Sequence, residues 1–248
     1  MKEARSTMAV TLNDLGQPVG ALLPDWKPPP TPARKIMSGV FCRVEPLDAG
    51  RHGQSLFEAN ALDREGRNWT YLSIGPFPSF ESYSAWLTES ASGSDPLFFA
   101  ILDRATERAV GVASYMRIDP RSGAIEVGHL NFSPQLQRKP AATEAMYLMM
   151  KNAFALGYRR YEWKANALNE PSRRAAQRFG FSFEGVFRQA TVAKGRNRDT
   201  AWYAVIDQEW PALESAYSRW LDPSNFDEKG RQKTALSTLT APVLKQRG

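Results

Sequence analysis

The stretch from Glu126 to Phe154, EVGHLNFSPQLQRKPAATEAMYLMMKNAF, joins a strand pattern to a helix pattern within a few residues. Its first part belongs to an apolar run over residues 123–132, which has the length of a buried strand. In its second part apolar residues recur at spacings of three and four, which predicts a helix over residues 141–156 with one buried face. Pro140 marks the helix start, because the missing N–H of proline has no intrahelical partner in the first turn. The stretch is therefore predicted to form a strand–loop–helix unit.

The loop of this unit has the chemistry of an anion site. The free N–H groups and the positive end of the helix dipole attract anions, and Arg138 and Lys139 add two full charges just before Pro140. Such a construction suits a phosphate or a pyrophosphate. The alternative is an ordinary capped helix preceded by two solvated cations, and the spacing alone leaves both interpretations open.

The rest of the chain predicts a mixed α/β sheet. The strand–loop–helix unit is followed directly by another strand, which predicts a parallel strand pair at this place. The other strands are predicted to form antiparallel hairpins. Helices are expected at residues 51–62, 79–90 and within 169–181, and strands at 39–47, 96–103, 109–119, 159–165, 185–193 and 199–207.

The 248 residues favour one large domain with extensions. We expect an N-terminal proline-rich extension at residues 1–38, a folded domain at 39–221 and a C-terminal basic tail at 222–248 that drapes over the domain or frays. No apolar run is long enough to span a bilayer and no signal sequence is recognisable, so a cytoplasmic protein is expected. The single cysteine, Cys42, fits a reducing compartment and is expected to be a small buried hydrophobe.

The net charge of +6 suggests an anionic partner. A nucleic-acid binder is one candidate, motivated by the charge and by the segment KGRNRD at residues 194–199. Two observations argue against a nucleic-acid binder. The 32 lysines and arginines are accompanied by 26 acidic residues, and the sequence has neither a zinc-finger spacing nor an RNA-recognition signature. Metal binding is not expected, because His52, His129 and Cys42 are the only histidines and cysteine in the chain.

The motifs of residues 126–185 resemble those of the GNAT superfamily of acyl-CoA-dependent N-acetyltransferases. In that family a loop of pattern Gln/Arg-x-x-Gly-x-Gly/Ala opens a helix and holds the coenzyme A pyrophosphate. Gln137 fits its first position and Ala142 its last, and TEA at residues 143–145 resembles the branch that acetylates ribosomal-protein N-termini. Pro140 departs from the pattern, since it stands where the family usually has glycine and donates no N–H.

The resemblance implies a mostly antiparallel sheet, splayed at a central parallel strand pair and flanked by helices. It also implies acetyl-CoA as co-substrate. A second segment, NEPSRRAAQRFGF, resembles the region where Asn169 and Ser172 bind the pantetheine arm, and Asn169 is independently a good helix cap. The residues expected to bind the coenzyme are Leu130, Asn131, Phe132, Gln137, Arg138, Lys139, Ala141, Ala142, Thr143, Asn169 and Ser172.

Acetyl transfer by direct attack in a ternary complex benefits from a base, because a free alkyl amine is mostly protonated at neutral pH. Glu126 and His129 are the candidates on the strand. Strict alternation would place them on opposite faces unless a bulge intervenes, and Glu126 is preferred because a carboxylate also attracts a cationic amine. Each is equally compatible with an ordinary strand residue. The family's thiolate-protonating tyrosine falls near Ala176, which cannot serve, so water is expected to fill that role.

For the acceptor site we expect an aromatic wall from Trp69 and Tyr71 and a carboxylate, Asp199, that meets a cationic acceptor. Core packing and a solvated turn are the respective alternatives. The acceptor implied is a primary amine, either a protein N-terminus or a small molecule, and a homodimer is compatible with the sequence. The alternative to an enzyme is a non-catalytic relative that binds coenzyme A or a partner, motivated by Pro140 and the absent tyrosine.

Overall fold

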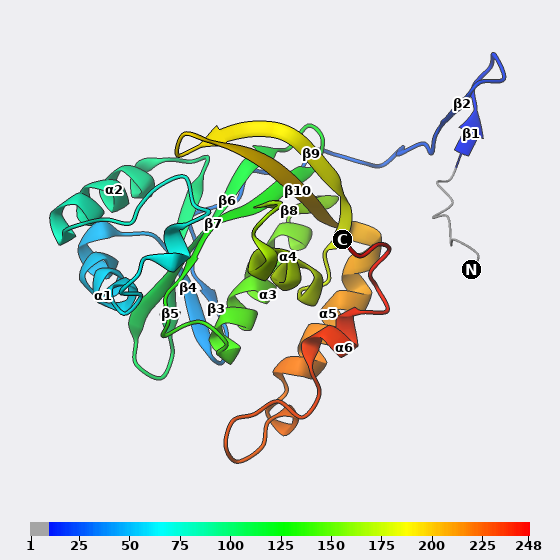
Figure 1. Cartoon of the computed structure of the whole chain (residues 1–248). Coiled ribbons are helices and arrows are strands. Elements are labelled where there is room, and N and C mark those ends of the chain that lie inside the picture. The colour runs from blue at the N-terminus through cyan, green and yellow to red at the C-terminus, as the bar shows by residue number, and fades with distance from the viewer. Residues whose placement is uncertain (1–9) are drawn as a thin grey trace.

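A computed structural model describes residues 10–248 and contains an eight-stranded sheet with helices on both faces (Figure 1). The strand order is β3-β4-β5-β6-β7-β8-β10-β9, and every neighbouring pair is antiparallel except β7 and β8. This confirms the expected fold class. The strands are β3 (Met37–Ser38), β4 (Cys42–Pro46), β5 (Leu97–Asp103), β6 (Arg108–Asp119), β7 (Ala124–Phe132), β8 (Arg160–Asn166), β9 (Ser182–Ala193) and β10 (Arg196–Ile206).

Two apolar cores form because the strands alternate between the faces of the sheet. Ile125 and Val127 of β7 point into the larger core, which includes the buried face of α3. Phe98 of β5 and Val112 of β6 point to the opposite side, where α1 and α2 pack over the first half of the sheet. The helices are α1 (Ala49–Ala61), α2 (Phe80–Ser92), α3 (Pro140–Ala155), α4 (Glu170–Arg178), α5 (Trp210–Leu221) and α6 (Leu236–Thr240).

Helix α3 begins at Pro140, within one residue of the sequence prediction. Its buried Glu144 holds the chain between β3 and β4, because the carboxylate accepts the backbone N–H groups of Val40, Phe41 and Cys42 at 2.8, 2.6 and 2.8 Å. Cys42 is fully buried, as expected, and both burial and the nearby Glu144 carboxylate raise the pKa of its thiol. A thiol held protonated in this way is not a nucleophile.

The segment at residues 222–248 packs on the domain. Leu236 and Thr240 of α6 are fully buried, the Thr240 hydroxyl donates to the Arg178 carbonyl at 3.0 Å, and the Lys245 N–H donates to Ser182 Oγ at 2.9 Å. The segment therefore lies over α4, α5 and β9.

The described part of the N-terminal extension has two parts. A short hairpin of β1 (Val10–Leu12) and β2 (Pro18–Gly20) stands off the body in Figure 1. Residues 21–36 form neither helix nor strand, as the prolines predict, and Pro29 and Pro32 are buried. The first nine residues of the expected extension lie outside the described part of the chain. Within residues 10–248, each helix is too short or too polar to cross a membrane.

Candidate functional site

The two parallel strands separate halfway along their length. Ala124–Val127 of β7 pair with Arg160–Trp163 of β8, and the pairing stops there although both strands continue. Just beyond this point His129 has a φ of +49°, a left-handed conformation uncommon for a residue other than glycine. The register with β6 shifts across the same residue, between the pairs Ser114–Gly128 and Val112–Asn131. A bulge therefore lies where the strands splay.

The bulge brings Glu126 and His129 to the same face of the sheet. Glu126 faces away from the α3 core, as strand alternation requires. His129 contacts Ser114 and Phe98, which lie on that same side. Both predicted base candidates therefore lie on one face of the sheet, opposite α3.

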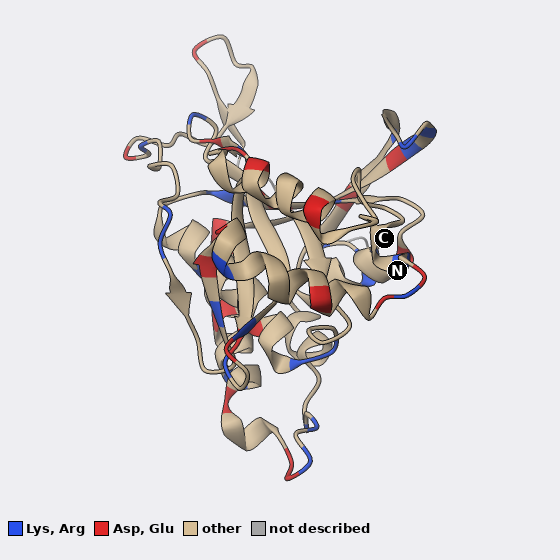
Figure 2. Ribbon diagram, turned by 90° about the vertical axis from the view of Figure 1, so that its left-hand side faces the viewer, with Lys and Arg blue, Asp and Glu red and all other residues tan. Residues whose placement is uncertain are grey.

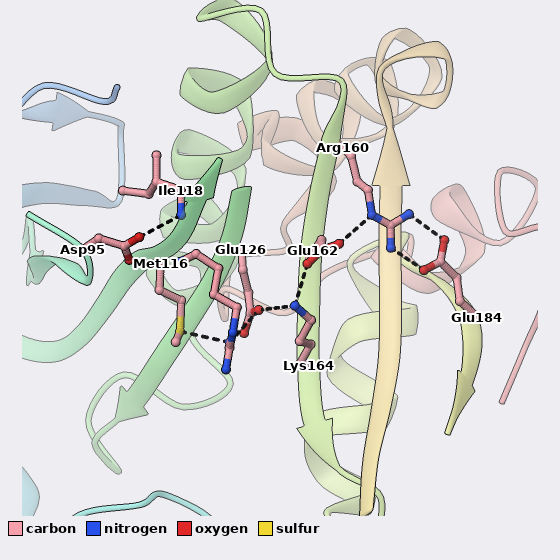
Figure 3. A network of polar contacts seen from close by, with 9 residues as sticks. Asp95, Met116, Ile118, Glu126, Arg160, Glu162, Lys164 and Glu184 are labelled. Atoms are coloured by element: carbon pink, nitrogen blue, oxygen red, sulfur yellow. Dashed lines mark hydrogen bonds and ion pairs between the residues drawn. The ribbon is translucent and has the colours of Figure 1, made fainter. Parts of the chain in front are cut away.

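Glu126 is the centre of a buried ion-pair network, shown in Figure 3. Its side chain is 3% exposed, and its carboxylate accepts from Arg117 at 2.8 Å and from Lys164 at 2.9 Å. Lys164 also pairs with Glu162 at 2.7 Å, and its ammonium lies 3.8 Å from the ring centroid of Trp202. Because this carboxylate is buried and already paired with two cations, Glu126 is poorly placed to contact an acceptor amine.

The surroundings of His129, unlike those of Glu126, favour a role as a base. Ser114 Oγ lies 3.0 Å from its Nδ1 and donates to the Gly128 carbonyl at 3.1 Å. Because a hydroxyl has one proton, Oγ is left to accept from Nδ1–H, and Nε2 then carries the lone pair. Burial first, and then the charge of Arg117, lower the pKa of His129 below its ordinary value of 6.5. The imidazole is thus neutral at pH 7, with Nε2 ready to accept a proton.

The loop before α3 has a tight, partly strained backbone. Arg138 is left-handed with a φ of +62°, Lys139 is the N-cap, and both side chains are exposed. The Lys139 N–H donates to Leu136 O at 3.2 Å and the Ala142 N–H to Lys139 O at 3.1 Å, so these two amides already have local partners. Ala141 is buried in the first turn of α3, beside Ala142.

Gln137 ties this loop to the neighbouring 3₁₀ turn, η1 (Arg67–Trp69). Its side-chain amide donates to Asn68 Oδ1 at 2.9 Å and to the Phe132 carbonyl at 2.8 Å. Leu130 and Phe132 pack against the α3 core. Asn131 is 3% exposed, and its side-chain amide has no hydrogen-bond partner within residues 10–248.

Sequence reasoning missed Arg178, which joins α4 to the start of α3. Its guanidinium donates to Thr143 Oγ1 from both terminal nitrogens, at 3.1 and 3.2 Å. Arg178 also borders a pocket of about 420 Å³ between α4 and the C-terminal segment, together with Arg174 and Arg247. All the charged residues that line this pocket are arginines. No local pattern signals this cluster, because Arg247 reaches it from 69 residues away.

Asn169 is the N-cap of α4, as expected. Its Oδ1 accepts from the Ser172 N–H at 3.2 Å, and Ser172 Oγ accepts from Trp163 Nε1 at 3.1 Å. Both predicted pantetheine contacts therefore lie together at the end of β8, across the splay from β7.

The acceptor-side residues have different surroundings from those expected. Trp69 is 4% exposed and packs edge-on against Phe77 and Tyr83, so its ring belongs to the smaller core. The Tyr71 hydroxyl reaches the Leu168 carbonyl at 3.2 Å, and this contact joins the loop after η1 to the start of α4. Asp199 Oδ1 accepts from the Gln189 N–H at 2.7 Å and from Asn197 Nδ2 at 3.0 Å, so this oxygen is used within the β9–β10 hairpin.

The tip of the β9–β10 hairpin is hydrogen-bonded to η1 and to the loop that follows it. Lys194 Nζ donates to the carbonyls of Trp69 and Gly75 at 2.7 and 2.8 Å, so the hairpin and the loop after η1 meet over the sheet. Across residues 10–248, no cluster of three or more His, Cys, Asp or Glu side chains could hold a metal ion. Figure 2 shows lysines and arginines interspersed with acidic residues.

Comparisons with known proteins agree with this geometry. The acetyltransferase (GNAT) domain model matches residues 51–182, more than half of the chain. A crystal structure of a GCN5-related N-acetyltransferase from Brucella melitensis is 49% identical, covers 88% of this chain and 100% of that one, and has a TM-score of 0.86.

Two more distant proteins are also similar. An uncharacterized N-acetyltransferase, p20, from Bacillus licheniformis is 27% identical over 113 residues, which are 45% of this chain and 63% of that protein. An acetyltransferase from Salmonella typhimurium, described as modifying the N-terminal serine of ribosomal protein L7/L12, shares the fold at 20% identity and a TM-score of 0.59, covering 69% of this chain and 99% of that one.

Proposed function

Since the chain belongs to the GNAT acetyltransferase family, we propose that it is an acetyl-CoA-dependent N-acetyltransferase that acts on a primary amine in a ternary complex. The observation that carries the proposal is the bulged splay between β7 and β8, with a neutral histidine on one face and the cationic start of α3 on the other. Such a splay leaves strand backbone groups unpaired, and these can polarise a thioester carbonyl.

On the donor side, the coenzyme pyrophosphate is assigned to the loop at residues 137–143. Pro140 removes one N–H from this site, and Lys139 and Ala142 use theirs locally. Binding therefore depends on the Arg138 and Ala141 amides and on the side chains of Arg138 and Lys139. The arginine-lined pocket beside Thr143 supports an acidic ligand here, since a phosphate group near it would meet positive charge. Asn169 and Ser172 are assigned to the pantetheine arm across the splay.

On the acceptor side, the amine nitrogen attacks the thioester carbonyl carbon, the C–N bond forms, and the C–S bond breaks. His129 Nε2 takes the proton that the amine loses. The departing thiolate takes a proton from water, because Ala176 is fully buried and has no acidic group. Glu126 was first preferred as the base. We now assign it a different role, in which its carboxylate balances the charges of Arg117 and Lys164.

The acceptor is proposed to be a protein or peptide N-terminus or a small amine. The first kind of acceptor, a protein N-terminus, is supported by the Salmonella protein, which is described as modifying an N-terminal serine. The support comes only from the fold that the two proteins share. A cytoplasmic location and self-association are further parts of the proposal, and the single buried Cys42 is compatible with a reducing compartment.

The proposal is tested by following free thiol release from acetyl-CoA across a panel of small amines and N-terminal peptides, with mass spectrometry of the products. Enzyme-dependent thiol release with a matching mass gain of one acetyl group supports it. Tight coenzyme binding without turnover on any amine would instead favour the non-catalytic relative, which Pro140 and the absent tyrosine motivate.

A further inference from the structure

Arg198 is a cation without an ion-pair partner among residues 10–248, on the face of the sheet opposite α3. It lies four residues before Trp202 on β10, so strand alternation places both side chains on the face where Lys164 covers the Trp202 ring. Arg198 is half-buried, and its Nε is buried without a hydrogen-bond partner. Among residues 10–248, its guanidinium enters no ion pair.

The neighbouring ion pairs form a separate network. Three cations alternate with three carboxylates in it (Figure 3), and Arg198 is not one of its members. Asp199, the neighbour of Arg198 in sequence, accepts two hydrogen bonds at Oδ1 within the hairpin and forms no ion pair with Arg198 among residues 10–248. The members of the network are Arg117, Glu126, Lys164, Glu162, Arg160 and Glu184.

We propose that Arg198 binds a carboxylate that the acceptor carries close to its reacting amine. This inference rests on the proposed function and names its substrate class: a free α-amino acid, or a peptide with an acidic side chain at its N-terminus. A guanidinium recognises a carboxylate through two parallel hydrogen bonds, which also fix the orientation of the bound group. The proposal adds a carboxylate to the cationic amine that Glu126 and Asp199 were expected to attract.

The energetics of the site favour such a ligand. Burial, followed by repulsion from Arg117, lowers the pKa of Arg198 while Glu126 partly offsets this, yet a guanidinium keeps its proton in proteins. An acceptor carboxylate would supply the missing counter-charge and offset the cost of removing the guanidinium from water. The positive charge of Arg198 also disfavours protonation of a nearby acceptor amine, which must be neutral to attack.

The test compares kcat/KM for matched acceptors that differ only in a carboxylate. One arm uses L-glutamate and L-alanine against their α-amides, and the other uses pentapeptides that begin with aspartate against the same peptides beginning with asparagine. We expect the carboxylate member of at least one arm to be preferred by roughly 10- to 100-fold, as expected for a charge-assisted hydrogen bond. The arm with the preference identifies the source of the carboxylate.

Variants assign the preference to Arg198. Arg198→Gln abolishes the preference by lowering kcat/KM for the carboxylate member of the pair, whereas Arg198→Lys keeps part of the preference because the charge remains. Arg196→Gln, an exposed position on the same hairpin, is the matched control and keeps the full preference. Equal kcat/KM for both members of every pair, or a preference that survives Arg198→Gln, would overturn the inference. Absence of turnover on every amine would contradict the proposed function itself.

Discussion

Ser114 Oγ lies 3.0 Å from His129 Nδ1 and gives its only proton to the Gly128 carbonyl. This relationship fixes the tautomer of the one imidazole in the cleft and leaves Nε2 as the proton acceptor. The bulge at His129 makes it possible, because the ring is turned to the face that carries Ser114. A backbone irregularity thereby supplies a neutral base beside the splay.

Replacing His129 with glutamine should lower kcat by about 100-fold or more, the usual contribution of a general base. The affinity for acetyl-CoA, measured by calorimetry, should stay within about twofold, because the ring lies on the face opposite α3. Full turnover in His129→Gln would exclude this residue as the base.

Ser114→Ala should reduce kcat by roughly tenfold, because Nδ1–H loses its acceptor and the ring can rotate or change tautomer. KM for acetyl-CoA should not change. The matched control is Ser55→Ala, which removes a half-buried hydroxyl of α1 that donates only to its own helix. A loss of the same size in both variants would indicate general destabilisation.

The pH profile of kcat/KM should have an acidic limb below pH 6.5, because the pKa of His129 is lowered and the neutral ring is the active form. Arg117→Gln removes one cause of that lowering, so the pKa should rise and the limb should move to higher pH. Arg121→Gln, an exposed cation on the turn after β6, should leave the limb in place. Movement to lower pH in Arg117→Gln would contradict the assignment.

Arg138 is predicted to have two separable roles. Arg138→Gly should raise the free energy of unfolding by about 0.5–1 kcal/mol, because glycine adopts a φ of +62° without strain. It should also weaken acetyl-CoA binding through loss of the cation. Arg138→Ala should weaken binding equally without the gain in stability, and thermal unfolding with calorimetry distinguishes the two effects.

Glu144→Ala should lower the free energy of unfolding by about 3 kcal/mol, because three backbone N–H groups between β3 and β4 lose their shared acceptor. Denaturant titration measures the change. Glu89→Ala on the exposed side of α2 is the control and should shift stability by less than about 0.5 kcal/mol. A small effect in Glu144→Ala would show that water replaces the carboxylate.

Local patterns predicted the parts of this fold whose signals are local. The spacing of apolar residues and Pro140 located α3 to within a residue, and an apolar run of strand length located β7. Gly128 directly precedes His129, and a glycine inside a strand often marks a bulge, but it does not determine which residue is the extra one. The effect of a bulge on Glu126 and His129 was therefore stated only as a condition. Contacts between distant segments escaped prediction altogether. Arg178 meets Thr143 across 35 residues, and α6 buries Leu236 in a segment without clear periodicity.

The burial of Trp69 shows a related limit. Its polar neighbours in the sequence suggested an aromatic wall, but the ring fills a space over Gly75 and between Phe77 and Tyr83. Only the arrangement of three separate segments determines that space. The same holds for Asp199, whose carboxylate is used by a hairpin register that the sequence does not specify.

The most direct test of the account is a calorimetric titration of wild-type protein with acetyl-CoA, repeated with the Arg138→Ala/Lys139→Ala double variant and with Pro140→Gly. We expect one micromolar site per chain, weaker by about tenfold in the double variant and unchanged or tighter in Pro140→Gly. Absence of binding by the wild type, restored by Pro140→Gly, would mean that proline has disabled the coenzyme site and would contradict the proposed enzyme.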